Sequence, residues 1–157
     1  MNKIRSLNSD ENVITVEAGV ILSNLRDAAE EAKRIFPLSL ASEGTAQIGG
    51  NLATNAGGVN VLRYGSTRNL CLGLEVVFAD GSIWNSLSRL HKDNTGYDLK
   101  NLIIGSEGTL GIITAATMKL FPKPLEHTVA LIAVKSPKEA LKLLSETKDY
   151  FGETISA

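Results

Sequence analysis

Hydrophobic positions in the first third of the chain predict one strand followed by one helix. The run Val13-Ile14-Thr15-Val16 is short and β-branched, and it is closed by Gly19, so it predicts a strand. After it, apolar residues recur at helical spacing, and charged residues of alternating sign fill the positions between them. These apolar residues are Ile21, Leu22, Leu25, Ala28, Ala29 and Ala32. We therefore expect an amphipathic helix whose charged face is solvated.

The middle of the chain predicts a hairpin. Residues 72–79 form a strongly apolar strand, Asp80-Gly81 supplies a two-residue turn, and Ile83-Trp84 begins the return strand. A further strand is expected from residue 112 to residue 120.

The end of the chain changes character at a pair of prolines, Pro122 and Pro124, which breaks the preceding strand. The apolar run 129–134 predicts another strand. Ser136-Pro137-Lys138-Glu139 then combines a capping box with proline at the first helical position, so a helix should begin there. Taken together, the elements predict an α+β fold.

Composition and charge exclude several classes of protein. The 17 acidic and 16 basic residues nearly cancel, so no electrostatic nucleic-acid footprint is expected. The longest apolar stretches are far shorter than the roughly 20 residues that cross a bilayer, so we expect no membrane span. The first six residues contain no apolar core of a secretory signal. A bacterial cytoplasm or a mitochondrial matrix is the expected compartment.

The residues that most often bind metals give no metal site. Cys71 is the sole cysteine and stands in an apolar run, so we expect a buried side chain and no disulfide within the chain. His91 and His127 are far apart, with no second ligand at a metal-like spacing from either, and surface positions are expected for both.

Two glycine-rich segments, 44–58 and 105–111, are the main candidates for a binding site. Glycine lets main-chain N–H groups approach a ligand and point together at an anion such as a diphosphate. A short helix within 48–56 would direct its N-terminus at the same anion. Tight turns or close strand packing explain such glycines equally well. The chain contains no GxxxxGK[ST] and no GxGxxG after a strand, which excludes a P-loop NTPase and a Rossmann NAD domain.

An ordered series of motifs covers nearly the whole chain and resembles the FAD-linked oxidase family typified by vanillyl-alcohol oxidase. The motifs are Val16-Glu17-Ala18-Gly19, Pro37-Leu38, 44–51, 53–58, Arg63-Tyr64-Gly65, 73–77, Asp80-Gly81, 94–99 and 105–114. Residues 92–100 are most similar to the D-lactate, glycolate and D-2-hydroxyglutarate dehydrogenase branch, and favour its D-2-hydroxyglutarate member.

This resemblance implies a fold and a domain division. Residues 1–124 correspond to the second subdomain of the FAD-binding fold, a mixed or antiparallel sheet flanked by helices, without the first subdomain. Residues 125–157 correspond to the first strand and helix of a substrate (cap) domain.

The resemblance also implies which residues line FAD, and it supplies no catalytic or metal-binding residue. The diphosphate, ribitol or flavin should lie along Pro37, Gly44, Thr45, Ile48, Gly49, Gly50, Asn51, Thr54, Asn55 and Gly58. Gly108, Gly111 and Ile112 should lie along the adenosine end, with Glu107 supporting their loop. Ile48 and Ile112 are alternatively core residues. Arg63 and Tyr64 either contact substrate or flavin or form a surface stack. Asp98 is expected to cap a helix.

The function implied is that of an FAD-binding fragment of a flavin-dependent dehydrogenase. Such an enzyme oxidises a D-2-hydroxyacid (lactate, glycolate or 2-hydroxyglutarate type) to the 2-oxoacid by hydride transfer to FAD. The isolated chain is not expected to be catalytically competent, because the substrate domain is truncated. The alternatives are a non-catalytic flavin- or nucleotide-binding module or remnant that associates with a partner chain or a second copy, and a glycine-rich domain without a cofactor.

Overall fold

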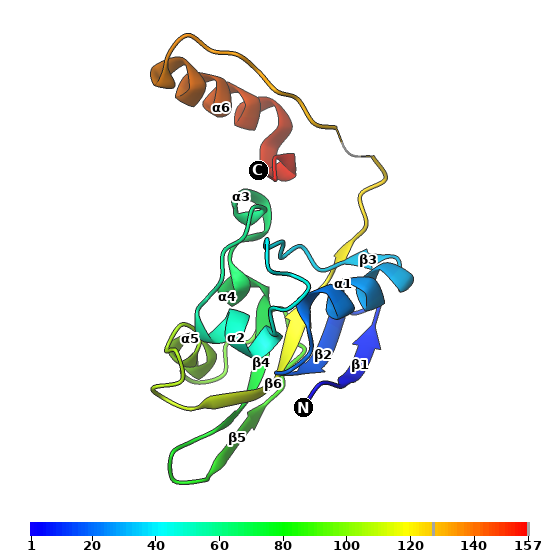
Figure 1. Ribbon diagram of the computed structural model, residues 1–157, viewed down its shortest axis with the longest axis vertical. Coiled ribbons are helices and arrows are strands. Elements are labelled where there is room, and N and C mark those ends of the chain that lie inside the picture. Colours follow the sequence, from blue (N-terminus) through cyan, green and yellow to red (C-terminus); the bar gives the residue numbers. More distant parts are fainter. Residues whose placement is uncertain (127, 157) are drawn as a thin grey trace.

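The computed structural model describes residues 1–126 and 128–156, and its centre is a five-stranded sheet (Figure 1). The strand order is β1 (Ile4–Asn8), β2 (Val13–Glu17), β6 (Ile112–Lys119), β4 (Cys71–Val77) and β5 (Ile83–Ser86). Every neighbouring pair in this sheet is antiparallel. Two short strands, β3 (Arg34–Ile35) and β7 (Phe121–Pro122), pair separately. The predicted α+β fold with an antiparallel sheet is confirmed.

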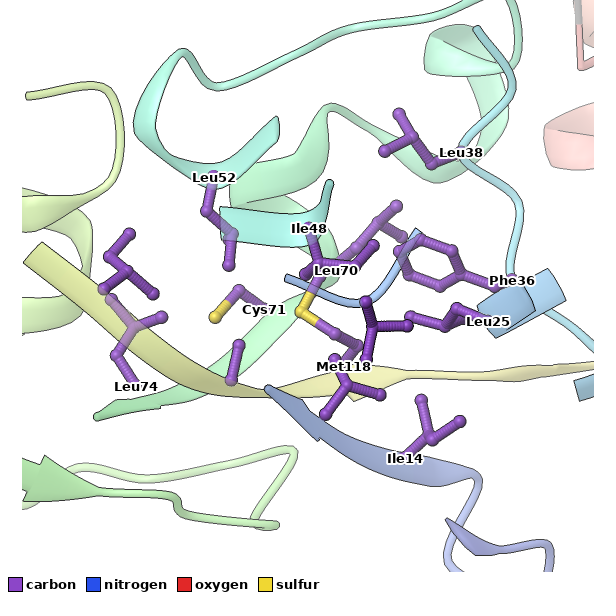
Figure 2. Close-up of a cluster of buried hydrophobic side chains, with 14 of the residues drawn as sticks. Ile14, Leu25, Phe36, Leu38, Ile48, Leu52, Leu70, Cys71, Leu74 and Met118 are labelled. Atoms are coloured by element: carbon purple, nitrogen blue, oxygen red, sulfur yellow. The ribbon is translucent and has the colours of Figure 1, made fainter. Parts of the chain in front are cut away.

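One face of the sheet is covered by helices, and the hydrophobic core lies between the two layers (Figures 1 and 2). The helices of this part of the chain are α1 (Leu22–Glu31), α2 (Ile48–Ala53), α3 (Val61–Tyr64), α4 (Thr67–Leu70) and α5 (Leu99–Ile103). From the sheet, Ile14 and Met118 enter the core, where they meet Leu25 of α1 and Ile48 and Leu52 of α2. This packing fixes the position of α2, which bears the first glycine-rich segment.

The opposite face of the sheet carries polar pairs that link neighbouring strands. Arg5 on β1 forms hydrogen bonds of 3.0 and 3.1 Å to the Glu75 carboxylate on β4. Thr114 Oγ1 donates to Glu75 Oε1 over 2.7 Å, and Arg5 also lies 3.4 Å from Glu17. These contacts hold strands β1, β2, β6 and β4 together on the side without helices.

The sequence predicted most of these elements correctly, and the hairpin turn is one correction. The strands at 13–16, 72–79 and 112–120 and the helix after Gly19 are confirmed. The turn has three residues instead of two, because Phe78 N donates to Ser82 O over 2.9 Å and Gly81 N donates to Phe78 O over 3.0 Å. Gly81 adopts φ +82°, as the third residue of such a turn requires.

The strand expected at 129–134 is the second correction. Residues 128–134 form no strand in the described part of the chain, since no neighbouring strand there supplies hydrogen bonds to them. The following helix, α6 (Pro137–Phe151), begins at the predicted residue. Ser136 Oγ accepts from Glu139 N over 3.3 Å, and Glu139 Oε2 accepts from Lys135 N over 3.0 Å.

Helix α6 stands apart from the sheet (Figure 1), and none of its described residues is buried. A short 3-10 turn, η1 (Gly152–Thr154), follows it and approaches α3, where Arg63 Nη1 donates to Thr154 O over 3.4 Å. The division into residues 1–124 and 125–157 as separate domains stays a prediction. No described helix is long and apolar enough to cross a membrane.

The structure also places the residues considered for metal binding. Cys71 is buried, as predicted, and His91 is exposed, with Nε2 3.2 Å from Glu11 O. His127 lies outside the described residues. Over residues 1–126 and 128–156, no group of three His, Cys, Asp or Glu side chains could hold a metal ion.

Candidate functional site

An open cleft of about 700 Å³ lies where the end of β2, the start of α2 and the loop 105–111 meet. It is lined by Met1, Asn2, Ala18, Gly19, Ile21, Gln47, Gly49, Gly50, Ala53, Ser106, Gly108, Gly111, Ile112 and Ile113. The fold thus brings the two glycine-rich segments, more than 50 residues apart in the sequence, to one surface. None of the lining side chains is charged, so no carboxylate in the lining would repel an anion.

The first turn of α2 is fixed against the segment between β2 and α1. Ile48 N donates to Val20 O over 3.0 Å, and Gly49 N donates to Ala18 O over 2.7 Å. A Cβ at residue 49 would lie only 2.7 Å from the Ala18 Cβ, so glycine is required for this close approach. Two of the helix's first N–H groups are therefore used in packing and are not available to a ligand.

Gly50 differs from Gly49 in both respects. A Cβ at residue 50 would meet no atom within 4 Å, and the residue is exposed at the cleft. Among the described residues no acceptor bonds to the Gly50 N–H. This N–H group is therefore available to a ligand in the cleft.

The second glycine-rich loop is attached to the other end of α2. Gly105 N donates to Leu52 O and Glu107 N donates to Ala53 O, each over 3.0 Å. The Ala53 carbonyl is one that the last turn of the helix leaves without a partner, whereas the Leu52 carbonyl also accepts from Asn55 N over 3.1 Å. The loop and α2 therefore form one unit, to which Glu107 contributes its main-chain N–H.

The backbone conformation of this loop depends on glycine at three positions. Gly105 has φ +83°, Gly108 has φ +80° and Gly111 has φ +159°. A Cβ at residue 111 would also lie 2.6 Å from Val76 Cγ1. Neither the Gly108 N–H nor the Gly111 N–H has an acceptor within the described part of the chain. Together with Gly50, these residues present three unpaired N–H donors at the cleft.

The cleft contains some of the residues that the sequence singled out and leaves others elsewhere. Gly49, Gly50, Gly108, Gly111 and Ile112 line it, and Ile112, which is 58 % exposed, is not a core residue. The predicted residues that do not line it are Pro37, Gly44, Thr45, Ile48, Asn51, Thr54, Asn55, Gly58 and Glu107. Ile48 is fully buried in the core, as its alternative interpretation held.

Several residues outside the lining support the backbone around α2. Thr54 Oγ1 donates to Gly50 O over 3.0 Å, and Asn55 Oδ1 accepts from Arg68 N over 3.0 Å. Asn51 is buried, and its Nδ2 has no hydrogen-bond partner among the described residues. An unpaired buried amide donor is costly unless another group accepts from it, so the buried side-chain donor of Asn51 is available to a ligand or a water.

Sequence reasoning missed other residues of the cleft, above all Gln47, Ser106 and Gly19. Gly19 was noted as the end of a strand and as part of the first motif of the family resemblance, but not as a residue of the site. In the structure its N–H donates to Met1 O over 2.8 Å, and a Cβ there would lie 2.3 Å from that oxygen. A glycine at the end of a strand can indicate that another backbone segment approaches closely, and this signal could have identified Gly19 as a residue of the cleft.

Three residues with alternative interpretations lie outside this cleft. Arg63 stacks on Tyr64, with its Cζ 5.0 Å from the ring centroid, which is the geometry of a surface stack. Asp98 accepts from Asn101 N over 3.3 Å at the start of α5, which confirms the capping interpretation. Burial is the largest influence on the pKa of Asp98 and raises it. The hydrogen bonds and charge of Lys100 and the hydrogen bonds from Asn101 together outweigh burial, so the pKa is lowered.

The geometry fits the diphosphate of a dinucleotide. Backbone N–H groups that converge without side chains in front of them bind phosphate oxygens well. Here three lining residues carry main-chain N–H groups without an acceptor among the described residues, and no lining side chain is charged, which is compatible with such a ligand.

Comparison with known proteins agrees with this interpretation. The model of the FAD binding domain family matches residues 1–86. The mitochondrial D-2-hydroxyglutarate dehydrogenase of Bos taurus is 48 % identical over 157 residues, which are all of this chain and 29 % of the relative. The D-2-hydroxyglutarate–pyruvate transhydrogenase of Saccharomyces cerevisiae is 39 % identical over all of this chain and 32 % of its own length.

A solved structure supports the same fold. An alkyldihydroxyacetonephosphate synthase superposes with a TM-score of 0.70 at 27 % sequence identity, over 80 % of this chain and 22 % of that one. The chain spans about 30 % of the length of the two relatives named above. Since the family match extends over more than half of the sequence, this chain belongs to the FAD binding domain family, and its cofactor is FAD.

Proposed function

We propose that this chain holds the diphosphate of FAD in the cleft between α2 and the loop 105–111. The observation that carries the proposal is the set of three unpaired N–H groups at Gly50, Gly108 and Gly111. Main-chain donors at a diphosphate need no side chain, and glycine at each position leaves room for the phosphate oxygens. Ile112, exposed beside Gly111, would then contact the adenosine end.

The remaining predicted residues receive supporting roles in this proposal. Asn51 Nδ2, buried and without a partner, would donate to the ligand or to a water bound with it. Pro37, Gly44, Thr45, Ile48, Gly49, Thr54, Asn55 and Gly58 would shape the backbone that surrounds the flavin half of the cofactor, and Glu107 would hold the second loop.

We further propose that the longer protein oxidises a D-2-hydroxyacid to a 2-oxoacid. The names of the bovine and yeast relatives support this substrate class, with 2-hydroxyglutarate favoured. When bound, FAD accepts the hydride that leaves the substrate carbon. No residue that lines the cleft carries a side chain that titrates near neutral pH. The contribution of this chain would therefore be to bind and orient the cofactor, and purified chain alone should not turn over a D-2-hydroxyacid with a dye acceptor.

Association with a complementing chain or a second copy is a second candidate role for the isolated chain. The observation that favours it is the exposure of large apolar side chains after residue 124, including Leu125, Leu131 and Tyr150. Exposed apolar surface of this kind favours association. The compartment proposed for the protein is the mitochondrial matrix, as the name of the bovine relative suggests, or a bacterial cytoplasm.

The direct test is a titration of FAD with purified chain, followed by quenching of flavin fluorescence. Gly50→Val places a branched side chain where the backbone is open to the cleft, and it should weaken FAD binding at least about tenfold, the loss of roughly one charge-assisted hydrogen bond. Gly57→Ala is the control, because residue 57 lies outside the cleft and a Cβ there makes only an ordinary 3.5 Å contact with Val61. Equal FAD affinities of these two variants would contradict the proposal.

A further inference from the structure

A second cavity, of about 330 Å³, is lined by four cationic side chains from four different elements. They are Arg63 of α3, Arg68 of α4, Lys100 of α5 and Lys119 at the end of β6. No carboxylate lines this cavity, and it shares no lining residue with the FAD cleft. Because the whole chain has a net charge of −1, this cluster of four positive side chains does not reflect the overall composition and requires an explanation.

Among the described residues, one of the four cations has a carboxylate partner. Lys100 Nζ lies 3.0 Å from Asp98 Oδ1. The Arg68 guanidinium donates instead to two backbone carbonyls, that of Asn101 and, over 2.5 Å, that of Ile104. Neutral carbonyl groups orient the guanidinium and leave its charge uncompensated.

Arg63 is held at the edge of the same cavity by an aromatic pair. Its guanidinium carbon lies 5.0 Å from the centroid of Tyr64, whose ring makes an edge-on contact with Phe121 at 4.8 Å between centroids. The three residues also line a smaller neighbouring cavity together with Thr154. The stack fixes the direction of the guanidinium without neutralising it.

Lys119 is the most informative of the four. Its side chain is partly buried, and within the described part of the chain its Nζ has neither an ion pair nor a hydrogen bond. The pKa of Lys119 is lowered, first by loss of hydration and then by the nearby charge of Lys100. Folding thus places an ammonium group beside other cations without an internal acceptor for its three N–H donors.

We propose that this cavity binds a compact, multiply charged oxyanion, with phosphate as the reference ligand, through Lys119, Arg68 and Arg63. A dianion would offset the mutual repulsion of the cations, and its oxygens would accept from the unused ammonium and guanidinium donors. A monocarboxylate supplies one charge and two oxygens, and it compensates the group less well. The phosphate group would belong either to inorganic phosphate or to a small phosphorylated metabolite.

The test is an NMR titration of the purified chain with inorganic phosphate, at constant ionic strength and in the presence of saturating FAD. Backbone resonances of residues 63–69, 100–101 and 119–121 should shift together and saturate. Lys119→Gln should weaken phosphate binding about ten- to a hundredfold, and Lys119→Arg should restore most of it. Lys92→Gln is the matched control, since Lys92 is exposed and outside the cavity. Sodium acetate should produce much smaller shifts than phosphate at equal concentration.

Thermal unfolding supplies an independent readout. Without phosphate, Lys119→Gln should unfold at a higher temperature than the wild type, because one uncompensated charge is removed, and phosphate should raise the midpoint of the wild type alone. Three results would each overturn the proposal: equal phosphate affinities of the wild type and Lys119→Gln, chemical-shift changes with acetate as large as those with phosphate, or no saturating shift with phosphate. Phosphate shifts that appear only when FAD is omitted would assign the cavity to the cofactor and overturn it as well. A glucose 6-phosphate titration then distinguishes the two sources: tighter binding than inorganic phosphate indicates a phosphorylated metabolite.

Discussion

Replacement of the two adjacent glycines of α2 by alanine should have opposite effects on stability. In Gly49→Ala the added methyl group would lie 2.7 Å from the Ala18 Cβ and 3.2 Å from the Ala18 carbonyl oxygen. Ala18 directly follows β2 and is only 9 % exposed, so its atoms have little room to move away from the added methyl group. The start of α2 would therefore have to move away from the sheet.

The magnitude follows from the two environments. Overpacking of a well-packed site costs about 1–3 kcal/mol, and the 2.7 Å hydrogen bond from Gly49 N to Ala18 O would be strained at the same time. We expect Gly49→Ala to lose about 2 kcal/mol, which corresponds to roughly 4–8 °C in the thermal midpoint of a domain this size. Gly50→Ala meets no atom within 4 Å and should gain about 0.5–1 kcal/mol, because alanine favours the helix over glycine.

The assay is urea unfolding of both variants, followed by circular dichroism at 222 nm and by the fluorescence of Trp84. The slopes of free energy against urea should match that of the wild type, so that the midpoints report stability directly. Equal shifts of the two midpoints in the same direction would refute the account of how α2 is fixed to the sheet.

Three further outcomes are expected. Arg5→Met should make the free energy of unfolding fall less steeply as the pH drops below about 4.3. Hydrogen bonds from Arg5 are the first cause that holds the pKa of Glu75 below its ordinary value, so ionised Glu75 stabilises the fold above its unfolded-state pKa and this contribution is lost as Glu75 is protonated in acid. If urea unfolding between pH 3 and 6 were the same in the variant as in the wild type, this expectation would be contradicted. Cys71 should not react with Ellman's reagent until the chain unfolds, because burial raises the pKa of its thiol to about 12, and rapid labelling at pH 8 would show that the thiol is accessible. Ser136→Ala removes the capping hydroxyl and should destabilise α6 by about 1 kcal/mol, measured as faster hydrogen exchange of residues 137–151. The unfolding midpoint of the sheet domain should not change, because no described residue of α6 is buried.

The elements that the sequence predicted correctly depend on interactions between close neighbours. The helix after Gly19 follows from its own apolar spacing, and the starts of α5 and α6 follow from the capping side chains of Asp98 and Ser136. The strand expected at 129–134 was wrong because a strand also requires a partner, and an apolar run carries no information on whether one is adjacent. The length of the hairpin turn was mispredicted because a glycine in the left-handed conformation, such as Gly81, occurs in two-residue and in three-residue turns alike.

The candidate site was predictable only in part, for the same reason. Both glycine-rich segments stood out in the sequence, but their meeting depends on hydrogen bonds from Gly105 and Glu107 to the end of α2. Spacing does not distinguish Gly49, which serves packing, from Gly50, which leaves its N–H unpaired. The four cations of the second cavity come from four elements, so no local pattern could have grouped them.

The central claim, that main-chain N–H groups at the glycine-rich cleft hold a diphosphate, is tested most directly by comparing ligands that differ in their phosphates. Calorimetric titrations of the purified chain with FAD, ADP, riboflavin and adenosine separate the contribution of the diphosphate from those of the flavin and the adenosine. The account predicts that FAD binds at least about tenfold more tightly than riboflavin and that ADP displaces it. Equal affinities for FAD and riboflavin, or no binding of FAD at all, would contradict it.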